Sequence, residues 1–225
     1  MNRLNRITLL LGQEAVEKLK QSTVMVVGCG AVGSFAIEAL ARSGIGHLIL
    51  IDSDVVEKSN INRQLFALDS TVGQPKVEIA KKRIRDINPD IIVDVLNIFF
   101  DDNTKLNVKP DFVIDAIDTI PSKIALYNWC IDNKVSFISS MGAARKTDVK
   151  QIKVANISKT SVCPLASKIR RLIRDLNMPD FPVVYSTENA TPQKDGGREF
   201  GSIITVTGTF GLMLADFVIR KLIQV

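Results

Sequence analysis

Residues 24–33 read Val24-Met25-Val26-Val27-Gly28-Cys29-Gly30-Ala31-Val32-Gly33, and this stretch decides the fold. Its first four residues form a continuous apolar run, which is typical of a parallel strand buried on both faces. A GxGxxG pattern follows at once: Gly28 allows a tight turn, Gly30 lets the backbone approach a phosphate, and Gly33 lets helix and strand pack closely. Residues 34–42 have helical spacing. The stretch therefore predicts a strand, a phosphate-binding turn and the start of a helix.

Apolar runs and helical segments alternate on both sides of this stretch. We expect further strands at residues 48–51, 91–96, 111–115, 135–139 and 151–155, and helices at residues 13–20, 75–87, 122–133, 165–176 and 210–222. This alternation predicts an α/β fold: a Rossmann-like, mostly parallel, doubly wound sheet with a C-terminal extension of strands and helices. We interpret residues 1–225 as one domain, with a nucleotide-binding core at about 5–140 and a substrate-facing part at about 141–225.

Composition excludes several other classes of protein. The chain has 225 residues, 46% of them hydrophobic, which argues against wholesale disorder. A formal net charge of +5 permits a polyanionic partner without requiring one. Cys29, Cys130 and Cys163 form no CxxC pair, so we expect neither a structural zinc site nor a disulfide framework. Because no apolar run is long enough to span a membrane, we predict a soluble protein of a reducing cytoplasm.

The glycine pattern alone does not identify the nucleotide, because it is typical of proteins that bind NAD or FAD. Asp52 ends the next expected strand, where a carboxylate can bind ribose hydroxyls. Hydride transfer is disfavoured because His47 lies at the wrong end of its strand and Tyr127 has Ile131, not Lys, four residues later. Ser34 follows Gly33, so no P-loop is present.

Polar side chains gather instead after three of the expected strands. Arg63 and Lys76 are candidates for binding phosphates, and Asp115 or Asp118 for binding magnesium. The whole set is Asn60, Asn62, Arg63 and Gln64, then Gln74, Pro75 and Lys76, then Asp115 and Asp118.

The order and spacing of these motifs over about residues 5–140 resemble the ATP-dependent adenylating enzymes of the ThiF/MoeB, ubiquitin-activating-enzyme-like superfamily. The resemblance implies that residues 28–33, called the glycine turn below, bind ATP together with Asp52. It also assigns ATP binding to Asn60, Arg63, Gln64 and Lys76. It further implies that Arg63, Lys76 and Asp118 are catalytic, that Asp118 holds Mg²⁺, and that Arg6 reaches the partner's site across a homodimer.

The second half resembles one branch of that superfamily, the tRNA threonylcarbamoyladenosine dehydratases. The motifs that carry this resemblance are Cys163-Pro164-Leu165-Ala166, a basic segment from Lys168 to Arg174, Val183 to Glu188, and Gly201-Ser202-Ile203 before the last helix. It implies a tRNA substrate whose threonylcarbamoyl carboxylate is adenylated and then cyclised, with Lys168, Arg170, Arg171 and Arg174 binding tRNA. We expect Cys163 to be structural and residues 191–201 to form a loop over the site.

Two other functions stay open. One is an adenylyltransferase that activates the C-terminus of a ubiquitin-like sulfur-carrier protein, although the missing CxxC pairs and the basic helix favour tRNA. The other is an NAD-dependent oxidoreductase or a non-catalytic Rossmann sensor, against which Arg63, Lys76 and Asp118 argue. The sequence leaves open whether a sulfur-transfer protein is a further partner and which group acts as base in the cyclisation.

Overall fold

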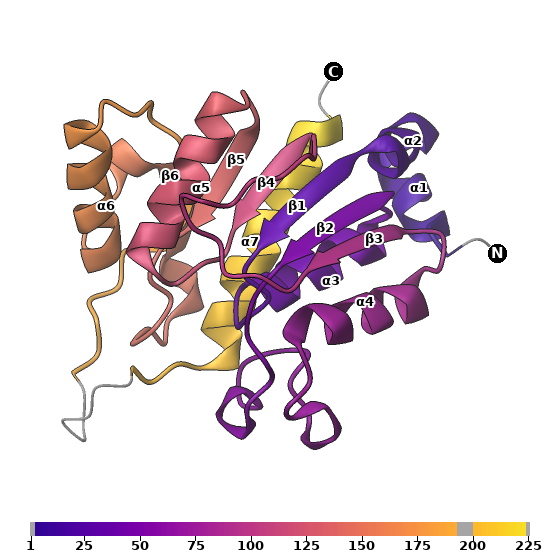
Figure 1. Cartoon of the computed structure of the whole chain (residues 1–225), viewed down its shortest axis with the longest axis horizontal. Helices are drawn as coiled ribbons and strands as arrows, with labels where there is room; N and C mark the ends of the chain where they lie inside the picture. The colour runs from indigo at the N-terminus through magenta and orange to yellow at the C-terminus, as the bar shows by residue number, and fades with distance from the viewer. Residues whose placement is uncertain (1–2, 193–199, 224–225) are drawn as a thin grey trace.

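The computed structural model describes residues 3–192 and 200–223 of the chain. Within them, seven strands form one sheet with helices on both faces (Figure 1). Across the sheet the order is β3-β2-β1-β4-β5-β7-β6, and only β6 and β7 pair antiparallel. The strands are β1 (Thr23–Val27), β2 (His47–Ile51), β3 (Ile92–Leu96), β4 (Phe112–Asp115), β5 (Ser136–Ser140), β6 (Ile152–Asn156) and β7 (Pro182–Ser186). The predicted mostly parallel, doubly wound α/β fold is therefore confirmed.

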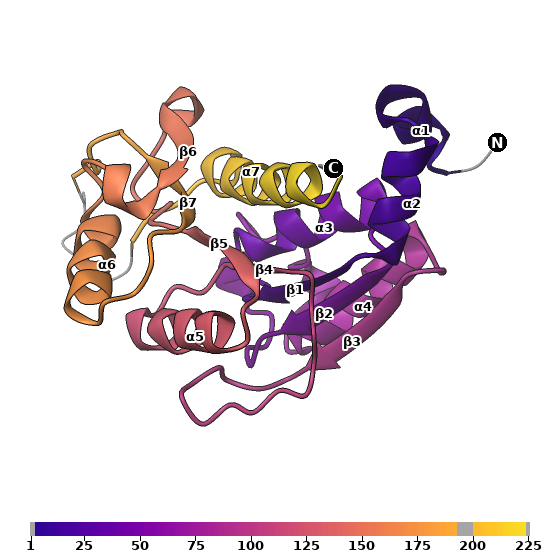
Figure 2. The same cartoon turned by 90° about the horizontal axis from the view of Figure 1, so that it is seen from above.

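Strand β1 shows why both faces of the sheet are covered. Val24 and Val26 belong to the apolar cluster beneath α2, α3, α4 and α7, whereas Met25 and Val27 belong to the cluster beneath α5 and α6. Figure 2 shows α3 and α7 on one side of the sheet and α5 on the other. The helices are α1 (Asn5–Leu11), α2 (Gln13–Gln21), α3 (Gly33–Ser43), α4 (Lys76–Ile87), α5 (Ile120–Asp132), α6 (Pro164–Asp175) and α7 (Ile204–Ile223).

The strand order reverses between β1 and β4. From β1 the chain builds outward through β2 and β3, and β4 then returns to the other side of β1. In open α/β sheets, ligands bind in the crevice outside the carboxyl ends of the strands at this point. The glycine turn follows β1 directly, so the fold places it at the expected position.

Three elements differ from the sequence predictions. Strand β7 and helix α1 were not anticipated. Helix α7 begins at Ile204, six residues earlier than expected. Glycine disfavours helices, but Gly208 and Gly211 let α7 approach α3 closely: a Cβ on Gly211 would lie 2.3 Å from the Val32 carbonyl oxygen. Tertiary packing therefore overrides local propensity here.

The loop expected over residues 191–201 lies partly outside the described residues, which stop at 192 and resume at 200. Its described ends are both tied to Arg145. The Thr191 N–H donates to the Arg145 carbonyl at 2.8 Å, and the Arg145 N–H donates to the Gly201 carbonyl at 2.9 Å. None of the helices in the described segments combines the length and the hydropathy that a membrane span requires.

Candidate active site

In the glycine turn, close packing leaves no room for a side chain at Gly28 or Gly33, whereas Gly30 is not constrained by packing. Gly28 has φ +95°, and a Cβ there would lie 2.5 Å from the Ala116 carbonyl oxygen. A Cβ on Gly33 would lie 1.7 Å from the Gly28 carbonyl oxygen. At Gly30, by contrast, a Cβ would come no closer than 3.8 Å to the nearest neighbour, Gln64 Nε2. The protein itself has room for a side chain at residue 30, so that space is free for a ligand.

Asp52 ties the end of β2 to the glycine turn. Its Oδ2 accepts the Cys29 N–H at 2.6 Å, and its Oδ1 accepts the Asp54 N–H at 2.8 Å. Burial raises the pKa of the Asp52 carboxyl, although these backbone donors oppose the shift. Each oxygen has a second lone pair, so the Asp52 carboxylate keeps the capacity to accept further hydrogen bonds.

Lys76 begins α4 and is almost fully buried. Its Nζ lies 2.7 Å from Oδ2 of Asp54, and its backbone N–H donates to the Asp54 carbonyl at 3.0 Å. The lysine is therefore held beside the end of β2, next to the glycine turn. The sequence analysis did not identify Asp54 as the partner of Lys76.

The segment between β2 and α4 carries the other expected phosphate-binding side chains. Asn60 is buried and accepts the Glu57 N–H, so it shapes its own turn. Arg63 is half-buried, and its Nη1 donates to the Ser59 carbonyl at 2.7 Å and to Asn62 Oδ1 at 2.9 Å. Gln64 is buried beside Gly30. The fold thus brings Asn60, Arg63 and Gln64 to the glycine turn within one segment.

The two aspartates after β4 have opposite environments. Asp118 is exposed and makes no hydrogen bond or ion pair with any residue that the structure describes. Asp115 is fully buried and pairs with Lys123, so it is not free to hold magnesium. In the described parts of the chain no group of three or more His, Cys, Asp or Glu residues could hold a metal by itself. A single carboxylate is nevertheless enough where Mg²⁺ is also held by phosphates.

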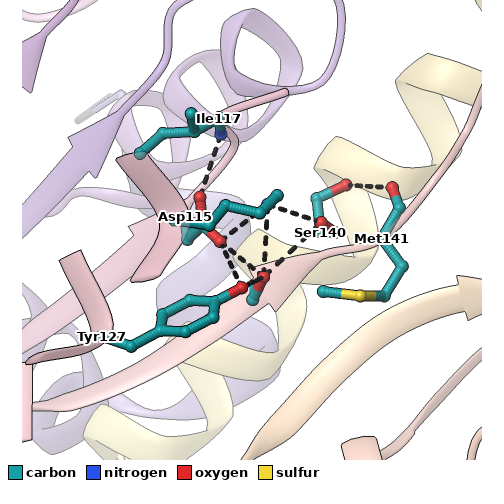
Figure 3. A network of polar contacts seen from close by, with 7 residues as sticks. Asp115, Ile117, Tyr127, Ser140 and Met141 are labelled. Atoms are coloured by element: carbon teal, nitrogen blue, oxygen red, sulfur yellow. Dashed lines mark hydrogen bonds and ion pairs between the residues drawn. The ribbon is translucent and has the colours of Figure 1, made fainter. Parts of the chain in front are cut away.

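The sequence analysis did not predict the buried polar network around Asp115 at the end of β4 (Figure 3). Lys123 Nζ lies 2.7 Å from Asp115 Oδ2, and the Tyr127 hydroxyl lies 3.0 Å from the same oxygen. The lysine stands four residues before Tyr127, one helical turn away, and not four residues after it as a dehydrogenase pair would require. Burial raises the Tyr127 pKa well above its usual value. Because the Tyr127 side chain is also fully buried, its hydroxyl does not face a substrate, which argues further against hydride-transfer chemistry.

Arg6 does not join the site of its own chain. It is exposed on α1, and the neighbouring Leu4 packs at Gly44, where α3 ends. The glycine turn lies at the other end of α3, about 16 Å away for a helix of this length. If Arg6 acts on a nucleotide, it must act on one bound by another copy of the chain.

The basic side chains of α6 divide into two groups. Lys168, Arg171 and Arg174 are exposed, whereas Arg170 donates to the Thr160 carbonyl at 3.0 Å and thereby holds the segment before α6. An open hollow of about 750 Å³ adjoins α6, and Arg170, Arg171 and Arg174 line it with residues that include Ser158 and Asp180. The buried Cys163 precedes this helix.

A glycine turn at the switch point of a parallel sheet, flanked by Lys76 and Arg63, defines a nucleotide-binding protein of the Rossmann-like class. The chain belongs to the ThiF family, which matches residues 2–225. Over 207 residues it is 49% identical to the tRNA threonylcarbamoyladenosine dehydratase of Bacillus subtilis (strain 168), covering 90% of this chain and 82% of the relative.

Solved structures of the Escherichia coli tRNA N6-threonylcarbamoyladenosine dehydratase are similar over almost the whole chain. The complex with AMP has a TM-score of 0.91 at 38% identity, covering 98% of this chain and 93% of that one. The complex with ATP has a TM-score of 0.90 at 37% identity, with the same coverage. The likeness therefore includes the C-terminal part as well as the nucleotide-binding core.

Proposed function

We propose that the protein is an ATP-dependent adenylating enzyme that acts on tRNA. It activates the carboxylate of threonylcarbamoyladenosine beside the anticodon and promotes its cyclisation, a net loss of water, with release of AMP and pyrophosphate. The observation that carries this proposal is the placement of buried Lys76 and half-buried Arg63 near the open space at Gly30. The match to tRNA-modifying relatives along nearly the full chain supports tRNA as the substrate.

The chemistry asks mainly for orientation and charge neutralisation. A carboxylate with a pKa near 4 is already ionised at pH 7, so its attack on the α-phosphate of ATP needs no general base. The glycine turn and the N-terminus of α3 bind phosphate oxygens, Asp52 binds the ribose, and Arg63 and Lys76 offset the charge of the phosphates. Asp118 would hold Mg²⁺, which would neutralise phosphate charge.

The second step closes a ring. A nitrogen of the same modified side chain attacks the acyl carbon of the adenylate, and AMP leaves with one of the former carboxylate oxygens. The attacking nitrogen forms the new C–N bond and loses its proton. Together with the oxygen carried away by AMP, this makes the product one water lighter than the substrate. Lys146, Tyr127 and Cys163 are all buried, so none of them stands exposed as the base for this step.

We also propose that the enzyme works as a homodimer. Arg6 is remote from its own site, and the same short helix exposes Leu9 and Leu10, which are 73% and 81% exposed. Adjacent exposed leucines beside an arginine suit an interface between copies of the chain. In this arrangement each α1 supplies Arg6 to the site of the partner.

For tRNA, we propose that residues 141–225 form the substrate-facing part of a single domain and that α6 contacts the sugar-phosphate backbone. Lys168, Arg171 and Arg174 are exposed on α6, and the hollow beside it leaves room for a phosphate chain. Arg170 lines the same hollow. Since the substrate is tRNA, we expect the enzyme in the cytoplasm.

One experiment tests the reaction and both alternatives. Purified protein is incubated with ATP, Mg²⁺ and tRNA that carries threonylcarbamoyladenosine, and the digested nucleosides are analysed by mass spectrometry. We expect a product lighter by one water, and AMP in equal amount. Adenylation of a ubiquitin-like carrier without any change in tRNA would instead establish the sulfur-carrier function, and tight binding of NAD in place of ATP would establish the third.

A further inference from the structure

Five polar groups from β4, β5 and α5 form a buried network. Lys123 Nζ donates to Asp115 Oδ2 at 2.7 Å and to the Ser140 carbonyl at 2.8 Å. The hydroxyls of Tyr127 and Ser139 lie 2.7 Å from each other, and both also contact Asp115 Oδ2. Because all these side chains are buried, none of them can touch ATP or tRNA.

The other carboxylate oxygen of Asp115 has a different partner. Asp115 Oδ1 accepts the Ile117 N–H at 3.0 Å, as Figure 3 shows. Between them, the Ala116 N–H donates to the Val27 carbonyl at 2.9 Å, and the Ala116 carbonyl packs against Gly28. The Asp115 carboxylate therefore fixes the turn that leads from β4, past the glycine turn, to Asp118.

Stability alone does not account for the ion pair. Replacing a buried ion pair by apolar residues of similar volume is often neutral or stabilising, because the pair costs desolvation. An apolar pair cannot, however, accept the Ile117 N–H. We infer that Asp115 is a positioning residue that presents Asp118 to the nucleotide-bound metal ion, and that Lys123, Tyr127 and Ser139 hold its carboxylate in the required orientation. This inference rests on the proposed role of Asp118.

Two double variants separate positioning from packing. Both Asp115→Asn/Lys123→Met and Asp115→Leu/Lys123→Met remove the buried charges, but only the first keeps an oxygen that can accept the Ile117 N–H. We expect the leucine variant to need about tenfold more Mg²⁺ for half-maximal AMP formation than the asparagine variant, since losing the hydrogen bond that holds the turn costs about that factor. Nucleotide binding without Mg²⁺ should be equal in both.

Hydrogen exchange at the Ile117 amide gives a readout that does not depend on catalysis. The amide should exchange about tenfold faster in the leucine variant than in the asparagine variant. Equal exchange, or an equal Mg²⁺ requirement while Asp118→Asn raises that requirement, would show that Asp115 does not position the turn. If Asp118→Asn leaves the Mg²⁺ requirement unchanged, the metal role of Asp118 in the proposed function fails, and with it the catalytic meaning of the turn, whatever the exchange rates.

Discussion

The ammonium group of Lys76 lies 2.7 Å from the carboxylate of Asp54, although Lys76 is buried and Asp54 is mostly exposed. The Asp54 carboxylate therefore neutralises the buried Lys76 ammonium group, as a phosphate of a bound nucleotide would. Because the backbone N–H of Lys76 is also held by Asp54, the lysine keeps its place at the start of α4. This arrangement presets a cation beside the glycine turn before any nucleotide binds.

We predict that Lys76→Met slows AMP formation by about 10²–10³-fold, the usual cost of losing one preorganised group that stabilises developing charge. The variant should still fold, because methionine has a similar length and Asp54 can be hydrated. Lys82→Met changes an exposed lysine of the same helix and should stay within about twofold of the wild-type rate. Steady-state AMP formation with modified tRNA measures both, and a wild-type rate for Lys76→Met would contradict the assignment.

The glycine turn allows stability and binding to be separated. Gly33→Ala should lower the free energy of unfolding by about 1–3 kcal/mol or more, because its Cβ would overlap the Gly28 carbonyl oxygen. Gly30→Ala should leave stability nearly unchanged but weaken ATP binding by about tenfold or more, or about 1.4 kcal/mol. Denaturant unfolding and calorimetric titration measure the two effects. Gly201→Ala, which would meet no atom within 4 Å, is the control, and normal ATP affinity in Gly30→Ala would place the phosphates elsewhere.

Local patterns were enough to predict most strands and the glycine turn, because buried parallel strands appear as unbroken apolar runs. They were not enough for features that depend on which strands become neighbours. Lys123 contacts both Asp115 on β4 and Ser140 on β5, and these two contacts require the two strands to be neighbours. The pairing of Lys76 with Asp54 joins residues 22 positions apart. All these contacts hold site residues in place, yet none of them produces a periodic signal in the sequence.

Charge reversal on α6 should weaken tRNA binding without changing ATP binding. The variant Lys168→Glu/Arg171→Glu/Arg174→Glu changes only exposed side chains and spares Arg170, whose contact with Thr160 is structural. The dependence of log affinity on log salt should become shallower by about one for each phosphate that the variant no longer neutralises. Filter binding over a range of salt measures this. The control, Lys82→Glu/Arg85→Glu, reverses two exposed charges on α4, and an equal loss of affinity per reversed charge in both variants would mean that α6 has no special part.

The position of Arg6 predicts complementation between two inactive variants. Arg6→Ala and Arg63→Ala should each lose about 10³–10⁵ in rate as homodimers, as when an arginine finger is removed. A mixed dimer contains one site in which Arg63 of one chain meets Arg6 of the other, while its second site lacks both. An equal mixture should therefore recover about a quarter of the wild-type activity, because about half of the dimers are mixed and each has one complete site.

Subunit exchange decides how this result is interpreted. Exchange is followed by mass spectrometry of an affinity-tagged and an untagged variant, and AMP formation is measured on the same mixture. If mixed dimers form and the mixture stays inactive, Arg6 does not act across the interface. An action within its own chain would then require α1 to leave Gly44, against which Leu4 packs. A monomer that is fully active would exclude the cross-subunit site altogether, whereas loss of both activity and association in Leu9→Glu/Leu10→Glu would tie the site to the exposed leucines of α1.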